Sequence, residues 1–112
     1  MLNPTFKEQV RILVCDLSRG AYAEVEADGR AGRLSAEILR RAVEEYGRQL
    51  VPIPEAGWAL VDVYERTDVV GMVSMDVPLW TVEEGRSDLT LSLEASWVDG
   101  APILRVENLH VM

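Results

Sequence analysis

Two strand-like runs joined by a short polar turn occupy the stretch Asp76-Val-Pro-Leu-Trp-Thr-Val-Glu-Glu-Gly-Arg-Ser-Asp-Leu-Thr-Leu-Ser-Leu-Glu94. In its second half Leu89, Leu91 and Leu93 alternate with polar residues. This period of two places the leucines on one face of a β-sheet and the polar side chains on the other. The pattern predicts a one-sided antiparallel sheet, which an apolar layer from elsewhere in the chain must cover.

Alternation of apolar and polar residues runs through the second half of the chain. The connections between the alternating runs contain Thr67-Asp68, Glu84-Gly85 and Asp99-Gly100, which are turn residues that suit hairpins. We therefore expect a four-stranded antiparallel meander. Its strands are predicted at residues 58–66, 72–80, 88–97 and 103–111.

Two irregularities are expected in these strands. Pro78 has no N–H to donate to a ladder, so its strand is predicted to be an edge, to bulge there or to end early. In the last strand the apolar residues change phase between Val106 and Leu109. A bulge at Glu107-Asn108 would reconcile the two phases.

The first half of the chain has helical spacing instead. Asn3-Pro4 is typical of a helix start, and Gly20 provides a left-handed stop. A short helical piece follows at residues 21–27. Ser35 is the predicted N-cap of a further helix, which Gly47 ends.

Helices followed by a meander indicate one α+β domain over residues 1–112, with the helices packed on one face of the sheet in two layers. Pro52 and Pro54 disfavour regular structure between the two parts. The expected divisions are a helical part at 3–47, an extended crossing segment at 48–57 and the sheet at 58–112.

Composition excludes several classes of function. The 112 residues are 48% hydrophobic and 27% charged with a net charge of −8, which is typical of a globular acidic protein. That charge argues against a nucleic-acid or anionic-membrane partner, because phosphate binding needs clustered Lys and Arg. Cys15 is the sole cysteine, so neither a disulfide nor a cysteine-based zinc site is expected, and no motif indicates a cofactor.

The N-terminal residues lack the basic and apolar regions of a secretory signal, and no apolar run approaches the roughly 20 residues of a membrane span. We therefore expect a cytoplasmic protein.

Candidate functional residues are few. His110 is the only histidine, so it is a candidate general base, and a hydrolytic triad would depend on it alone. If the first two strands pair, Asp62 and Tyr64 share a face with Asp76 and Trp80. That group could bind a protein partner, hold a small molecule with Asp62 or Asp76 as acid or base, or form an ordinary solvated sheet face.

Four segments resemble a family of short, uncharacterised bacterial proteins, mainly actinobacterial, and this resemblance implies no particular activity. They are Asp28-Gly-Arg-Ala-Gly-Arg-Leu-Ser-Ala-Glu37, Arg40-Arg-Ala-Val-Glu-Glu-Tyr-Gly47, Asp76-Val-Pro-Leu-Trp-Thr-Val-Glu-Glu-Gly-Arg-Ser-Asp-Leu-Thr-Leu91 and Asn108-Leu-His-Val111. More loosely, helices before a curled meander are similar to the cystatin-like roll of nuclear transport factor and ketosteroid isomerase relatives. That similarity implies a pocket between helix and sheet.

The leading hypothesis is a non-catalytic protein-binding module, of a toxin-neutralising or enzyme-partner type, that binds through Asp62, Tyr64, Asp76 and Trp80. The alternative is a small-molecule binder or acid–base enzyme with a pocket between the helices and the sheet. A homodimer through the sheet face is the third possibility.

Overall fold

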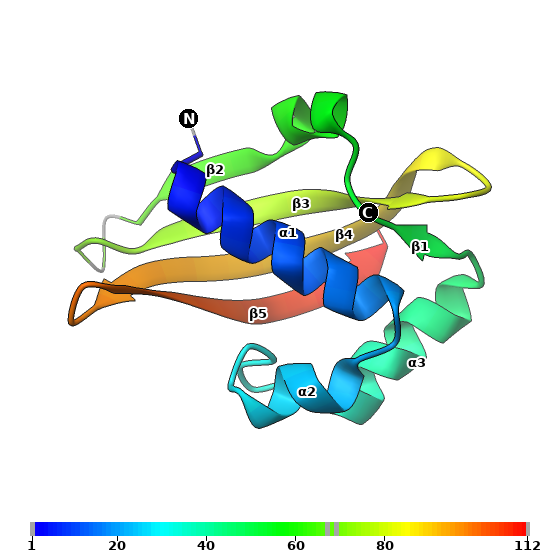
Figure 1. The fold of residues 1–112 in the computed structure, drawn as a ribbon, viewed down its shortest axis with the longest axis horizontal. Coiled ribbons are helices and arrows are strands. Elements are labelled where there is room, and N and C mark those ends of the chain that lie inside the picture. Colours follow the sequence, from blue (N-terminus) through cyan, green and yellow to red (C-terminus); the bar gives the residue numbers. More distant parts are fainter. Residues whose placement is uncertain (1, 67, 69, 112) are drawn as a thin grey trace.

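The computed structural model describes residues 2–66, 68 and 70–111. Figure 1 shows α1 (Pro4–Ser18) lying across one face of a curled antiparallel sheet, with α3 (Ala36–Tyr46) next to strand β5 (Ala101–Val111) and α2 (Tyr22–Ala27) next to α3. The predicted two-layer α+β class is therefore confirmed. The helices are α1 (Pro4–Ser18), α2 (Tyr22–Ala27) and α3 (Ala36–Tyr46), and the strands are β1 (Leu50–Val51), β2 (Asp62–Glu65), β3 (Val73–Thr81), β4 (Gly85–Val98) and β5 (Ala101–Val111).

The helix ends follow the predicted capping residues. Asn3 accepts a hydrogen bond at its Oδ1 from the N–H of Thr5, at 2.8 Å, and so caps α1. Ser35 accepts one at its Oγ from the N–H of Ile38, at 3.2 Å, and caps α3. Gly47 has a φ of 75° at the end of α3, a left-handed conformation that glycine adopts without steric cost.

The sheet contains the predicted meander and one strand more. Strands β2 to β5 pair consecutively and antiparallel, in the order expected of hairpins. The prediction of an extended crossing segment without regular structure at 48–57 was partly wrong, because the strand β1 lies within it and pairs with β3. The N–H of Val82 also donates to the carbonyl oxygen of Gln49, at 2.9 Å, so backbone pairing continues beyond β1.

The strand predicted at residues 58–66 was also wrong in its first half. A 3-10 helix, η1 (Glu55–Leu60), takes its place, and only β2 is extended. Pro54 starts the turn, since its carbonyl oxygen accepts the N–H of Gly57 at 2.8 Å. Tertiary packing favours this turn, because Gly57 lies directly against the indole of Trp80, where a side chain would collide.

Both predicted irregularities are bulges. The register of β3 with β4 shifts just after Pro78, where residues 87–89 of β4 lie opposite Leu79 alone. The hydroxyl of Ser87 donates a hydrogen bond to the carbonyl oxygen of Leu79 at 2.8 Å and so gives this backbone group a partner within the bulge. In β5, Glu107 is the unpaired extra residue, as predicted.

The apolar core lies between α1 and the sheet. The three leucines of the quoted stretch, Leu89, Leu91 and Leu93, are each at most 1% exposed. They therefore face the helix layer, as the alternation predicted. Buried residues from α1 cover them: Phe6, Val10, Leu13, Val14 and Leu17.

Arg30 holds the loop after α2 against two other elements. Its Nη1 lies 2.7 Å from Oδ2 of Asp16 in α1, and its carbonyl oxygen accepts the N–H of Val106 in β5 at 2.7 Å. Arg19 contacts the same carboxylate at 2.9 Å. Burial opposes ionisation of Asp16, but the hydrogen bonds from Arg30 and Arg19 outweigh it and hold the pKa of this carboxyl below its ordinary value.

Candidate functional site

The sheet face opposite the core carries polar side chains from four strands. The pairing of β2, β3, β4 and β5 aligns them in cross-strand rows, and all are half-buried or exposed. We call this surface the open sheet face. It comprises Asp62, Tyr64, Ser74, Asp76, Ser92, Glu94, Arg105, Asn108 and His110.

The structure brings three of the four predicted partner-binding residues together on the open sheet face. Asp62 pairs directly opposite Asp76. Tyr64 is next on β2 in the same phase, and its side chain is 50% exposed. Partial desolvation raises the pKa of the Tyr64 hydroxyl, and the charges of Asp62 and Asp76 raise it further, so the phenol lies within the field of both carboxylates.

In the described part of the chain, no cation forms an ion pair with either of these two carboxylates. Ser92 donates a hydrogen bond to Oδ1 of Asp76 at 2.7 Å. Like charges directly opposite each other destabilise a sheet. Asp62 and Asp76 therefore form a negatively charged pair on the open sheet face.

The other two predicted residues do not join Asp62, Tyr64 and Asp76, although His110 shares the open sheet face. Trp80 packs against Gly57, and its indole nitrogen is buried, so it presents little surface to a partner. His110 is on β5, opposite Thr90 of β4, and is thus two strands away from Asp76 on β3. That separation is about 10 Å between backbones. The structure does not assemble these residues into one site.

Glu94 of the open sheet face forms a second carboxylate pair with Glu107. Burial raises the pKa of Glu107, as do the hydrogen bond and charge of Glu94, whereas Arg66 and Arg33 oppose the rise. Arg66 reaches across the sheet, with its Nη1 3.5 Å from Oγ of Ser74 and 3.8 Å from Oε1 of Glu107. Sequence reasoning missed this pair, although Glu94 follows the leucine alternation and Glu107 is the predicted bulge residue.

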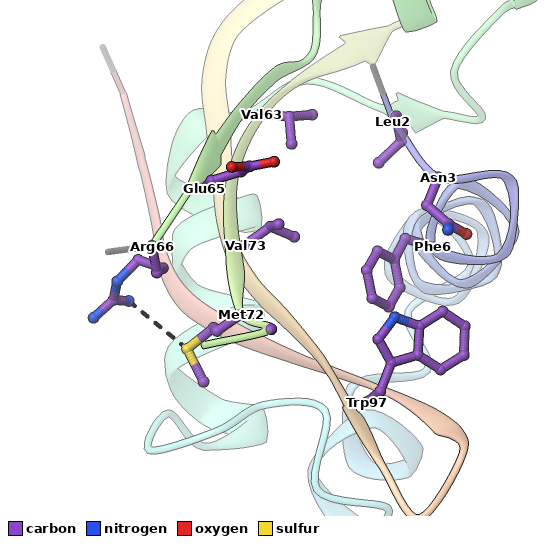
Figure 2. A pocket seen from close by; sticks show the side chains of 10 residues that line it. Leu2, Asn3, Phe6, Val63, Glu65, Arg66, Met72, Val73 and Trp97 are labelled. Atoms are coloured by element: carbon purple, nitrogen blue, oxygen red, sulfur yellow. Dashed lines mark hydrogen bonds between the residues drawn. The ribbon is translucent and has the colours of Figure 1, made fainter. Parts of the chain in front are cut away.

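A pocket of about 400 Å³ opens between the start of α1 and the hairpin of β2 and β3. We call it the end pocket (Figure 2). Phe6 and Trp97 form one wall, with ring centroids 5.1 Å apart and planes tilted by 34°. The lining residues are Leu2, Asn3, Phe6, Val63, Glu65, Arg66, Gly71, Met72, Val73 and Trp97.

One carboxylate faces the end pocket. Glu65 shares the helix-facing phase of β2 with Val63, and Figure 2 shows its carboxylate pointing across the opening toward α1. Arg66 turns the other way, where its guanidinium contacts Asp68 at 2.6 Å. Asp62, Asp76 and His110 are not among the described lining residues. Sequence reasoning missed Glu65 and Trp97, because their meeting with α1 depends on the packing of the two layers.

In the described part of the chain, no three His, Cys, Asp or Glu side chains gather closely enough to hold a metal ion. No helix within the same residues has the length and apolar character needed to cross a membrane.

Comparison with known proteins identifies a family and no activity. A family model matches residues 14–112, so Leu2, Asn3 and Phe6, which line the end pocket, precede the match. No curated protein and no solved structure matches the chain. The expected bacterial origin and the similarity to cystatin-like rolls therefore stay predictions. Because the match covers most of its length, the chain belongs to the family described as a domain of unknown function, DUF7668.

Proposed function

We propose that the protein is a non-catalytic binding module whose open sheet face docks a basic surface of a protein partner. One observation carries the proposal: the half-exposed ring of Tyr64 lies beside the directly opposed carboxylates of Asp62 and Asp76. A tyrosine supplies apolar contact area together with a hydroxyl, which makes it a frequent anchor residue in protein interfaces.

The partner's chemistry follows from the charge of the face. A Lys or Arg side chain placed between Asp62 and Asp76 would relieve the repulsion of their opposed carboxylates. The net charge of −8 acts in the same direction, since it accelerates encounter with a basic protein at low salt. Trp80, included in the interface by the sequence, is replaced in this proposal by Ser74 and Glu94, which share the face.

The test begins with crosslinking and affinity capture from the host organism, followed by titration of each purified candidate partner in a calorimeter. The double variant Asp62→Lys/Tyr64→Ala changes two exposed side chains. It should lower the affinity for the true partner at least tenfold, which corresponds to about 1.4 kcal/mol or more of binding free energy. Glu45→Lys, an exposed change on α3 with the same charge reversal, is the control and should leave the affinity within twofold. Raising the salt concentration should weaken the wild-type complex.

The proposal is wrong if every purified partner binds the double variant as tightly as the wild type. It is also wrong if the protein stays partnerless after crosslinking, or if light scattering shows that the face is buried in a homodimer that the double variant dissociates.

A further inference from the structure

The end pocket has the size and walls of a site for a small ligand. At about 400 Å³ it lies toward the lower end of the range of roughly 300–1,000 Å³ for such sites. Its apolar walls come from three separate parts of the chain, so the concavity is a product of the fold. They are Leu2, Phe6, Val63, Val73 and Trp97 (Figure 2).

Part of the aromatic wall of the end pocket is exposed and can contact a ligand. Phe6 is 5% exposed and forms part of the core, whereas Trp97, which packs against it, is 45% exposed. A half-exposed indole in a concave apolar site can cover an apolar body, and its face also attracts a cation. Removing this surface from water is the main source of affinity that the pocket offers.

The charge at the opening of the end pocket favours a positively charged ligand. Glu65 directs its carboxylate across the opening, and the nearest lining cation, Arg66, turns away to Asp68. The positive end of α1 opposes a cation, but its partial charge of about half a unit is smaller than the full charge of Glu65. Moreover, Oδ1 of Asn3 accepts a hydrogen bond from the N–H of Thr5, so one of the free N–H groups that carry this positive partial charge already has a partner.

We propose that the end pocket binds a small protonated amine with an aromatic or branched hydrocarbon body. The body packs between Val63, Val73 and Trp97, and the ammonium group pairs with the carboxylate of Glu65. The net charge of −8 raises the local concentration of such cations. This site is separate from the open sheet face, because Val63 and Glu65 are in the opposite phase of β2 to Asp62 and Tyr64.

The experiment compares three probes of nearly equal size: 2-phenylethylamine, 2-phenylethanol and phenylacetate. Each is titrated into the ¹⁵N-labelled protein at pH 7, and the indole N–H resonance of Trp97 is followed, assigned as the peak that is missing from Trp97→Phe. We expect the amine to shift this resonance and to bind about fivefold more tightly than the alcohol. A difference of this size is what one partly exposed ion pair contributes to the binding free energy. Phenylacetate should bind most weakly.

Variants separate the charge from the walls. Glu65→Gln keeps the shape of an exposed side chain and should bring the affinity for the amine down to that for the alcohol. Glu45→Gln removes the same charge from an exposed site on α3 and should keep the preference for the amine. The proposal is overturned if the Trp97 resonance does not move, if phenylacetate or the alcohol binds as tightly as the amine, or if Glu65→Gln leaves the preference unchanged.

Discussion

Gly57→Ala tests the packing that ties η1 to the sheet. A Cβ atom at Gly57 would lie 2.8 Å from Nε1 of Trp80 and 2.9 Å from Cγ2 of Ile53. Ile53 is buried, the indole nitrogen is buried, and the two groups approach from different segments. Gly57 is not among the glycines with positive φ, so any penalty comes from collision rather than from backbone strain.

The size of the effect follows from two opposing contributions. Adding a methyl group to a filled site costs about 1–3 kcal/mol. Replacing a glycine by alanine also restricts the unfolded chain, which stabilises the protein by about 0.4–1 kcal/mol. We therefore expect Gly57→Ala to lower the free energy of unfolding by about 1–2 kcal/mol. For a domain of this length that corresponds to a fall in Tm of about 4–8 °C.

The assay is urea unfolding followed by circular dichroism, for the wild type, Gly57→Ala, Trp80→Phe and the double variant. Phenylalanine removes the indole nitrogen while the contact with Ile53 remains, so the penalty of Gly57→Ala should fall to about half in the Trp80→Phe background. A neutral or stabilising Gly57→Ala would refute the reasoning. An equal penalty in both backgrounds would show that Trp80 does not cause it.

Two further predictions concern titration. Asp16→Asn should lower the free energy of unfolding at pH 7 by about 2 kcal/mol, because it weakens charge-assisted hydrogen bonds from Arg30 and Arg19. The pKa of Asp16 is lowered in the folded protein, so this stabilisation is present above the ordinary pKa of 3.8 and is lost as the pH falls through the pKa of the folded state. The difference in unfolding free energy between Asp16→Asn and the wild type, measured with urea, should therefore shrink as the pH falls. A difference that stays constant with pH would contradict this role of Asp16. Glu107→Gln should raise the free energy of unfolding at pH 7 by about 0.5 kcal/mol, because it removes a partly buried charge and the repulsion of that charge by Glu94. The pKa of Glu107 is raised in the folded protein, so the destabilising effect of its charge is absent below the ordinary pKa of 4.5 and grows as the pH rises through the pKa of the folded state. If Glu107→Gln lowers the free energy of unfolding at pH 7, the prediction is wrong.

Local chemistry explains why much of the fold was predictable. Asn3 and Ser35 cap their helices through hydrogen bonds to backbone groups two or three residues away. Leu89, Leu91 and Leu93 alternate because the geometry of a strand does. Likewise the phase change that predicted the bulge at Glu107 is visible within a few neighbouring residues. In each of these cases the interacting groups are close in the sequence, so their pattern is sufficient.

Residues 50–60 show where this reasoning failed. β1 exists because it pairs with Trp80 and Thr81, which lie about thirty residues later in the chain. A strand of two residues is also too short to show a period of two. η1 replaces the predicted strand because Gly57 must lie against Trp80. The same contact leaves Trp80 half-buried, with its indole nitrogen covered, instead of on the predicted binding surface.

For the candidate sites, the sequence alone determined the phase that Asp62 shares with Tyr64, because alternation along a strand is local. Their meeting with Asp76 depended on the register of β2 with β3, which a slip of one residue would have inverted. The end pocket was decided by tertiary structure alone. Phe6, Glu65 and Trp97 are far apart in the chain, and they meet only because burial of the leucine face requires α1 to lie across the sheet.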